Sequence, residues 1–288
     1  MLRSSTVKTS HADIAVTETS GTGLPVLLIH GNSSCKEVFA NQLNSPMADV
    51  YRMIAIDLPG HGASSDAYNP RETYSLHGYA DATVEVLNAL NVPQAAVFGW
   101  SLGGHIAIEL LERYQGLVGL MLAATPPVHA TPEGMQAGFK AHPMVSLIGK
   151  ADLTDEEVEM FGRGAYADSL TPTLTASLRR TDGRARAMMF EGLFTGRASD
   201  QHDLVTASTR PIAMVNGADD PIINTDYIGG LAYKSLWDKH CFVFRGVGHA
   251  PFLTHPDLFN PIFERFVGDM AALAQRKPKQ TSKAEAAA

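Results

Sequence analysis

A serine flanked by glycines is the sharpest chemical signal in the chain, where residues 99–104 read Gly-Trp-Ser-Leu-Gly-Gly. This GxSxG pattern follows an apolar run at residues 95–100 and precedes a helix-like stretch. A GxSxG motif at a strand-to-helix turn is a nucleophile elbow, because the tight turn needs small neighbours and pushes the serine hydroxyl above the sheet. Ser101 is therefore the predicted nucleophile. The alternative is an ordinary glycine-rich turn with a capping serine.

A hydroxyl becomes a good nucleophile only when a base removes its proton, so a histidine and an acid that orients it should follow. In folds that carry such a nucleophile elbow, the serine comes first along the chain, then the acid, then the histidine. Asp219 and Asp220 follow an apolar run at 211–216, and His249 follows another at 240–245. Both positions lie past the carboxyl ends of expected strands, where ligands bind in open α/β sheets. We predict a triad of Ser101, His249 and Asp220. Asp219 is the alternative acid. Asp220 is favoured because its Gly-x-x-Asp spacing after Gly217 lets the chain turn once before the carboxylate points back at the imidazole.

The segment His30-Gly31-Asn32 ends another apolar run, at residues 25–30. Attack on a carbonyl creates an oxyanion that needs prearranged hydrogen-bond donors. The backbone N–H of Leu102, directly after the nucleophile, is one expected donor, and the N–H of Asn32 is the other. His30 is interpreted as ordering this loop and not as the base. A helix N-terminal turn capped by serines is a compatible alternative for this segment.

Other segments carry weaker signals. The glycine-rich stretch 57–64 lacks the spacing of a nucleotide-binding loop and is interpreted as a structural turn, with His61 at most at a pocket rim. The chain contains no HExxH, CxxC or HxH pattern, so neither a metal nor another cofactor is predicted. The indole N–H of Trp100 could bind a substrate carbonyl, or the ring could simply pack.

The elements that must position these residues follow from hydrophobic patterning. Six short apolar runs, at 25–30, 53–57, 95–100, 117–124, 211–216 and 240–245, mostly lack strict alternation, which favours strands covered on both faces. Stretches with helical periodicity lie at 74–90, 102–114 and 256–273. Alternating strands and helices are typical of an α/β fold with a mostly parallel sheet flanked by helices.

The alternation stops after residue 127. Residues 128–208 have helical composition, and Thr154 to Glu157 form a capping-box pattern that should open a helix near Asp155. We therefore expect a core domain from residues 1–127 and 209–274, a helical cap from 128–208, and a disordered tail at 275–288. The cap aromatics are interpreted mostly as its core, with one or two lining an acyl pocket: Phe139, Phe161, Tyr166, Phe190 and Phe194.

Composition bounds the function class. The chain has 288 residues, a net charge of −7 and 45% hydrophobic residues, which fits a globular protein and argues against nucleic-acid binding. Cys35 and Cys241 are too isolated to suggest a disulfide framework. No apolar run approaches the ~20 residues of a membrane span, and no export signal appears. We expect a cytoplasmic protein that acts on a small molecule, without nucleic-acid or membrane partners; the sequence does not fix its oligomeric state.

Together these motifs resemble the α/β-hydrolase superfamily over residues 14–273. The stretches HGNSS, DLPGHG, VFGWSLGGHI, ATPP, TDGRAR and NGADDP look most like the AidH-type N-acyl-homoserine lactonases. That group is metal-independent and opens the lactone ring of bacterial quorum-sensing signals. The resemblance implies Ser101 as nucleophile, His249 as base and Asp220 as acid, where the lactonases carry glutamate. It also implies that Asn32 and Trp100 contact the lactone, and Gly31 is expected beside them.

One cap position departs from that family. Phe161 aligns where the lactonase cap offers a tyrosine to the substrate, and the missing hydroxyl removes a hydrogen bond worth roughly 0.5–1.5 kcal/mol. Tyr166 could replace it, or the substrate could differ. The expected activity is hydrolysis of N-acyl-homoserine lactones through an acyl-enzyme. The alternatives are a general carboxylesterase, a C–C bond hydrolase, or a ligand sensor with a hydrolase pocket.

Overall fold

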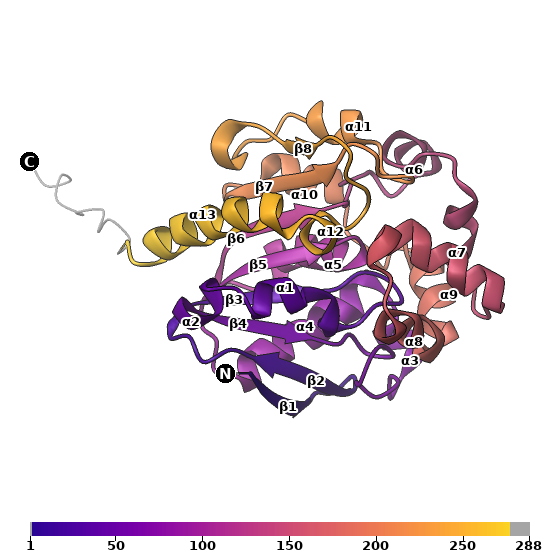
Figure 1. Ribbon diagram of the computed structural model, residues 1–288, viewed down its shortest axis with the longest axis horizontal. Helices are drawn as coiled ribbons and strands as arrows, with labels where there is room; N and C mark the ends of the chain where they lie inside the picture. Colours follow the sequence, from indigo (N-terminus) through magenta and orange to yellow (C-terminus); the bar gives the residue numbers. More distant parts are fainter. Residues whose placement is uncertain (1, 277–288) are drawn as a thin grey trace, which may run out of the picture.

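The computed structural model describes residues 2–276, which are built around an eight-stranded sheet (Figure 1). The first two strands and β4 pair antiparallel, and all other neighbours are parallel. The order across the sheet is β1 (Arg3–Lys8), β2 (Asp13–Glu18), β4 (Tyr51–Ile56), β3 (Gly23–Ile29), β5 (Ala95–Trp100), β6 (Leu117–Ala123), β7 (Ile212–Gly217) and β8 (Phe242–Phe244). The six expected strands correspond to β3–β8, although β8 is only three residues long.

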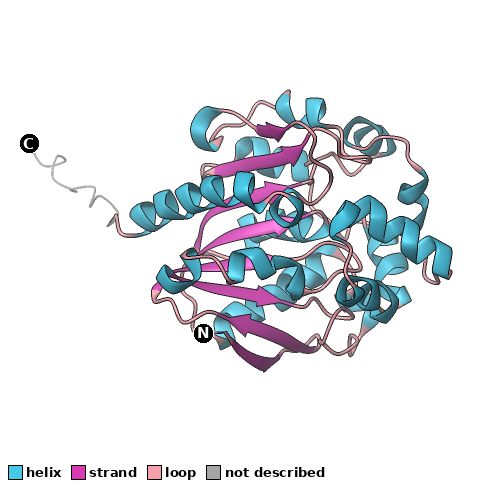
Figure 2. Cartoon of the chain, in the orientation of Figure 1, coloured by secondary structure: helices cyan, strands magenta, loops and turns pink. Residues whose placement is uncertain are grey.

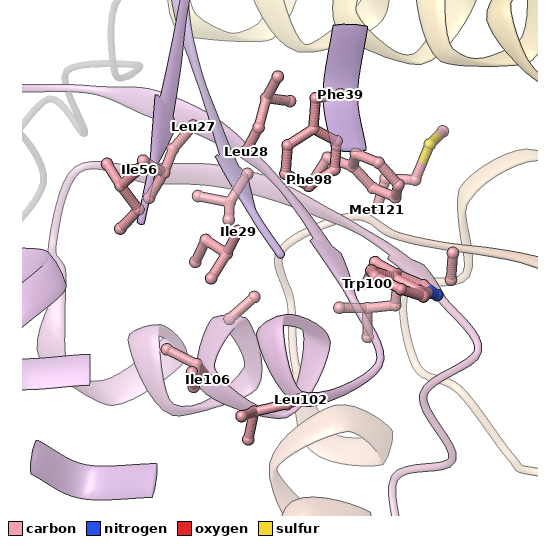
Figure 3. Close-up of a cluster of buried hydrophobic side chains, with 14 of the residues drawn as sticks. Leu27, Leu28, Ile29, Phe39, Ile56, Phe98, Trp100, Leu102, Ile106 and Met121 are labelled. Atoms are coloured by element: carbon pink, nitrogen blue, oxygen red, sulfur yellow. The ribbon is translucent and has the colours of Figure 1, made fainter. Parts of the chain in front are cut away.

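Helices cover both faces of this sheet (Figure 2). Figure 3 shows Phe98 and Met121 on the face toward α13 (Pro256–Ala274), and Ile106 on α5 (Leu102–Arg113) on the opposite face. Both layers are apolar because β5 and β6 are buried along their whole length. The core helices are α1 (Ala40–Leu43), α2 (Met47–Val50), α3 (Pro70–Thr73), α4 (Leu76–Ala89), α5 (Leu102–Arg113), α11 (Thr225–Gly229), α12 (Pro251–Thr254) and α13 (Pro256–Ala274).

Residues 128–208, which we propose to treat as a cap, fold as helices beyond the carboxyl ends of the strands (Figure 1). The Thr154 capping box is formed: Glu157 N–H donates to Thr154 Oγ1 at 3.3 Å, and Thr154 N–H donates to the Glu157 carboxylate at 2.9 Å. The helices are α6 (Pro132–Gly138), α7 (Asp155–Tyr166), α8 (Pro172–Arg180), α9 (Gly183–Gly192) and α10 (Gln201–Ala207). The expected disordered tail lies outside the described residues from 277 onward.

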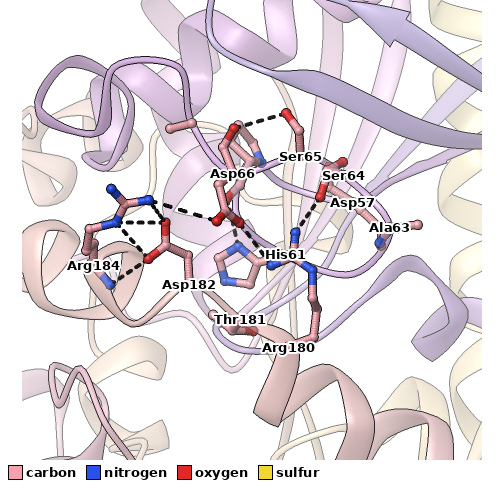
Figure 4. A network of polar contacts seen from close by, with 12 residues as sticks. Asp57, His61, Ala63, Ser64, Ser65, Asp66, Arg180, Thr181, Asp182 and Arg184 are labelled. Carbon is pink, nitrogen blue, oxygen red and sulfur yellow. Dashed lines mark hydrogen bonds and ion pairs between the residues drawn. The ribbon is translucent and has the colours of Figure 1, made fainter.

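The glycine-rich turn after β4 anchors the cap, as Figure 4 shows. The Arg180 guanidinium donates to the Ser64 carbonyl at 2.7 Å and pairs with Asp66 at 3.0 Å. Asp182 N–H donates to the Gly60 carbonyl at 2.9 Å. His61 is buried and does not line the cavity described below, so it does not reach even the pocket rim, which was the most that the sequence suggested. The turn is structural, as predicted.

Two further observations concern the whole described chain. Cys35 and Cys241 are both free thiols. None of the helices between residues 2 and 276 combines the length and apolar character that crossing a bilayer requires.

Candidate active site

Ser101 occupies a strained turn between β5 and α5. Its backbone has φ 54° and ψ −121°, a conformation that residues with a Cβ rarely adopt. The neighbouring glycines are needed for space: a Cβ on Gly99 would lie 2.4 Å from the Gly103 carbonyl oxygen, and one on Gly103 would lie 2.1 Å from the Ile29 oxygen. The predicted elbow is therefore present in the backbone, and close approach of three segments explains its glycines.

His249 and Asp220 are joined by a short hydrogen bond, 2.7 Å from Nδ1 to Oδ2. Both side chains are almost fully buried. The other carboxylate oxygen, Oδ1, accepts from the N–H groups of Ile222 at 2.9 Å and Ile223 at 3.0 Å. Burial alone would raise the pKa of Asp220, but the charge and hydrogen bond of His249 and the two backbone donors outweigh it and lower the pKa. Asp220, and not Asp219, thus orients the imidazole.

Ser101 and His249 both line a cavity of about 600 Å³ between the sheet edge and the cap. Most of its wall is apolar, which suits an acyl chain. Four of the five cap aromatics line it, more than the one or two expected: Phe139, Phe161, Phe190 and Phe194. The rest of the apolar wall comes from Leu76, Trp100, Leu102, Val128, Ala130, Met135, Ala141, Met144, Val145, Ile148, Ala165, Met189, Leu193, Ala198 and Ile222.

The two expected oxyanion donors lie at the edge of this cavity. Asn32 and Leu102 both line it, and neither backbone N–H has a hydrogen-bond partner among residues 2–276. His30 orders the loop: its Nε2 accepts from Leu58 N–H at 3.0 Å, so its Nδ1 carries the proton and donates to the Gly31 carbonyl at 2.7 Å. Burial lowers the pKa of His30 to about 4, which keeps the ring neutral.

Trp100 packs against His249 and holds the loop of that residue in place, so its indole N–H is not free for a substrate. The indole N–H donates to the backbone carbonyl of His249 at 2.9 Å, and the two ring centroids lie 5.5 Å apart. This bond ties the loop that carries His249 to the strand that leads into Ser101. Gly31 leaves room for the indole, since a Cβ there would lie 2.9 Å from its ring, and Gly31 itself is not part of the cavity wall.

Tyr166 does not take the place of the tyrosine that the lactonase cap provides. Its ring is fully buried 5.7 Å from the ring of Trp100, outside the cavity wall. Its hydroxyl has no hydrogen-bond partner within the described residues. Phe161, by contrast, does line the cavity. The expectation that Tyr166 meets the substrate is therefore corrected, because packing against Trp100 holds its hydroxyl away from the cavity.

Sequence reasoning missed Arg186, in the TDGRAR stretch. Its guanidinium is buried, donates to the Ser33 hydroxyl at 3.1 Å and to the Lys150 carbonyl at 2.8 Å, and so joins the cap to the loop that carries Asn32 and Ser33. Asn32 makes a parallel link, from its side-chain amide to the Ile148 carbonyl at 2.9 Å. An arginine in a helical stretch has no local signal of such a role.

One group of side chains in the described part could hold a metal ion: His129, Asp200, His202 and Asp203, with ligand atoms within 4.8 Å of one another. These residues lie where the cap joins the core, and none lines the cavity. The Ser101, His249 and Asp220 arrangement contains the groups for acyl transfer to water without a metal ligand set.

The chain is similar to known proteins over most of its length. The model of the alpha/beta hydrolase family matches residues 26–262. The structure of N-acyl homoserine lactonase AidH complexed with N-butanoyl homoserine has a TM-score of 0.91 and 41% identity, covering 96% of this chain and 99% of AidH. A complex of a mutant AidH with N-hexanoyl homoserine lactone has a TM-score of 0.90 and 42% identity, covering 93% of this chain and 98% of the mutant.

Curated sequences add a second similarity. A pimeloyl-[acyl-carrier protein] methyl ester esterase of Stenotrophomonas maltophilia is 28% identical over 263 residues, covering 88% of this chain and 96% of the esterase. The same enzyme of Nitrosospira multiformis is 26% identical over 260 residues, with 86% and 96% covered.

Proposed function

The chain belongs to the alpha/beta hydrolase family, and on that basis we propose that it is a serine hydrolase that opens the lactone ring of N-acyl-homoserine lactones. The observation that carries the proposal is that His249, hydrogen-bonded to the buried Asp220, lines the same apolar cavity as the strained Ser101. The similarity to AidH over nearly the whole chain supports the lactone as substrate.

The proposed reaction begins with proton transfer from the Ser101 hydroxyl to Nε2 of His249. The serine oxygen attacks the lactone carbonyl, and the N–H groups of Leu102 and Asn32 stabilise the oxyanion. His249, held by Asp220, then protonates the ring oxygen as the C–O bond breaks; the alcohol so formed stays attached to the acyl group. Water, activated by the same imidazole, hydrolyses the acyl-enzyme and releases the ring-opened acid.

The cavity also makes a prediction about chain length. Each methylene that leaves water for an apolar wall contributes up to about 0.8 kcal/mol of binding free energy. The wall formed by Phe161, Phe190 and Phe194 should therefore favour longer acyl chains until the volume of about 600 Å³ is filled.

An open-chain esterase is the second candidate, favoured by the similarity to the pimeloyl methyl ester esterases. The same triad hydrolyses either substrate class, so the fold does not separate them. The ratio of kcat/KM for an N-acyl-homoserine lactone and for the methyl ester of the corresponding acyl chain does.

The test compares purified wild-type protein with Ser101→Ala, using N-hexanoyl- and N-decanoyl-homoserine lactone in a pH-stat assay and a p-nitrophenyl ester. We expect wild-type turnover of the lactones and a loss on the order of 10⁴-fold or more in the variant. Ser235→Ala, a serine on the surface away from the cavity, is the matched control and should keep full activity. Full activity of Ser101→Ala would contradict the mechanism. Turnover of esters but not lactones would leave the esterase.

A further inference from the structure

His105 is a second histidine in the wall of the proposed catalytic cavity, and the mechanism does not use it. It lies four residues after Ser101, and its backbone N–H donates to the Ser101 carbonyl at 3.1 Å. The two residues are thus one helical turn apart at the start of α5, on the same side of the helix. Its ring stacks on Phe139, also in the cavity wall, with 6.2 Å between ring centroids.

Hydrogen bonds fix the tautomer of this ring. The side-chain amide of Gln201 donates from Nε2 to the His105 carbonyl at 2.9 Å and to the Glu109 carboxylate at 2.9 Å. Its oxygen must therefore be the atom that lies 2.6 Å from Nδ1 of His105. Since an oxygen accepts, Nδ1 carries the proton, and Nε2 of the neutral ring holds a lone pair.

That lone pair is available to a hydrogen-bond donor in the cavity. Within the described residues no group donates to Nε2, and this nitrogen is not among the side-chain atoms that are buried without a partner. His105 is partly accessible and lines the cavity, so the access to Nε2 is through the cavity. Burial lowers the pKa of His105 despite the bond to Gln201, which favours the neutral, accepting form.

A buried network behind the ring prevents it from turning. Glu109 is fully buried and accepts from the Ser199 hydroxyl at 2.7 Å, from the Ser199 N–H at 3.1 Å and from Gln201. Arg113 lies 3.3 Å from the same carboxylate. Gln201 is thus held on two sides, and the acceptor on His105 has a fixed direction.

We propose that Nε2 of His105 accepts a hydrogen bond from the amide N–H of the substrate and so selects lactones that carry an acylamino group. This inference rests on the proposed function. In an N-acyl-homoserine lactone the amide nitrogen is bonded to the carbon next to the carbonyl that Ser101 attacks. His105 follows Ser101 by one helical turn, a spacing that places side chains roughly 5–6 Å apart at Cβ, so its acceptor is close enough to meet this N–H. A site built to pair with a substrate N–H discriminates against analogues that lack it.

The test uses two lactones and three forms of the protein. The substrates are N-octanoyl-homoserine lactone and an α-alkyl-γ-butyrolactone of the same length, which lacks the amide. The proteins are wild type, His105→Phe, which keeps a planar ring but removes the acceptor, and His105→Gln, which restores an acceptor oxygen. We expect His105→Phe to lower kcat/KM about 5- to 10-fold for the amide-bearing lactone and less than 2-fold for the other. His105→Gln should recover part of the loss.

Other outcomes separate this inference from the proposed function. An equal loss on both lactones would give His105 a structural role only, and would overturn the inference while leaving the lactonase proposal intact. Wild-type protein that shows no preference for the amide-bearing lactone would also overturn it, without the need for any variant to fold. Wild-type protein that hydrolyses p-nitrophenyl octanoate but neither lactone would refute the proposed function itself.

Discussion

Replacing Asp220 by asparagine tests the orientation of His249, the proposed catalytic base. In the structure Oδ1 of Asp220 accepts from two backbone N–H groups, at 2.9 and 3.0 Å, and Oδ2 faces Nδ1 of His249. An asparagine has only one oxygen, and the two donors will hold that oxygen where Oδ1 now lies. Its NH₂ group must then face Nδ1, so Nδ1 becomes an acceptor and the ring proton moves to Nε2.

An imidazole protonated on Nε2 cannot take the proton of Ser101. We therefore expect kcat to fall about 10⁴-fold, the size of effect that the same change has in a serine protease triad. Because asparagine keeps the two backbone bonds, the folded structure should survive. The pKa of Asp220 is lowered in the folded state, so its ionised form stabilises the protein above the unfolded pKa of about 4, and this stabilisation is lost as pH falls through the folded pKa.

The assay measures kcat on a p-nitrophenyl ester, with thermal unfolding recorded for each variant. Asp219→Asn is the matched control, because the Asp219 side chain is not bonded to His249, and it should keep activity within about 2-fold. A folded Asp220→Asn variant that retains a tenth or more of wild-type kcat would refute the assigned role of Asp220.

Three further outcomes follow from the same structure. Ser101→Gly should abolish activity, yet its unfolding free energy from urea titration should exceed that of Ser101→Ala by about 1 kcal/mol, because only glycine adopts a φ of 54° without strain. Equal unfolding free energies would contradict strain at the elbow. Burial lowers the pKa of His61 to about 3, so the unfolded chain binds a proton that the folded chain does not between pH 6.5 and 3. Unfolding free energy should fall by about 2–3 kcal/mol from this residue between pH 6.5 and 4.5, and His61→Phe should remove that part of the slope. Arg186→Met should lower kcat/KM about 10-fold by releasing Ser33; Arg184→Met, at an exposed position, should not, and equal effects in the two variants would count against anchoring by Arg186.

The features that sequence predicts well here are those fixed by local backbone sterics. The glycines around Ser101 are required by contacts with Gly103 and Ile29 backbone atoms, so the motif itself indicates the elbow. The sequence predicts Asp220 and His249 as site residues because each follows a short apolar strand at the ligand-binding edge of the sheet. Chain order and strand placement are enough for this, since the fold brings the carboxyl ends of parallel strands together.

The features that sequence does not predict depend on partners far along the chain. The indole of Trp100 bonds to a carbonyl 149 residues away, and the guanidinium of Arg186 to a hydroxyl 153 residues away. No periodicity or spacing encodes such pairs. Strand β1 lacks a sequence signal for another reason. Strand β1 lies at the sheet edge and is mostly exposed, so it lacks the apolar run by which the other strands were recognised.

The contacts between cap and core bear on how specificity and rate are connected in this protein. Cap residues 148–151 bind the loop of Asn32 and Ser33 twice. The Asn32 side-chain amide donates to the Ile148 carbonyl, and Arg186 bridges Ser33 and the Lys150 carbonyl. Ile148 also lines the cavity that would hold the acyl chain. The wall that would contact the substrate tail and the loop that carries the proposed oxyanion donor Asn32 are therefore joined by two hydrogen-bonded links. A displacement of this wall by a poorly fitting chain must move Asn32 as well, so acyl-chain length should affect kcat and not only KM.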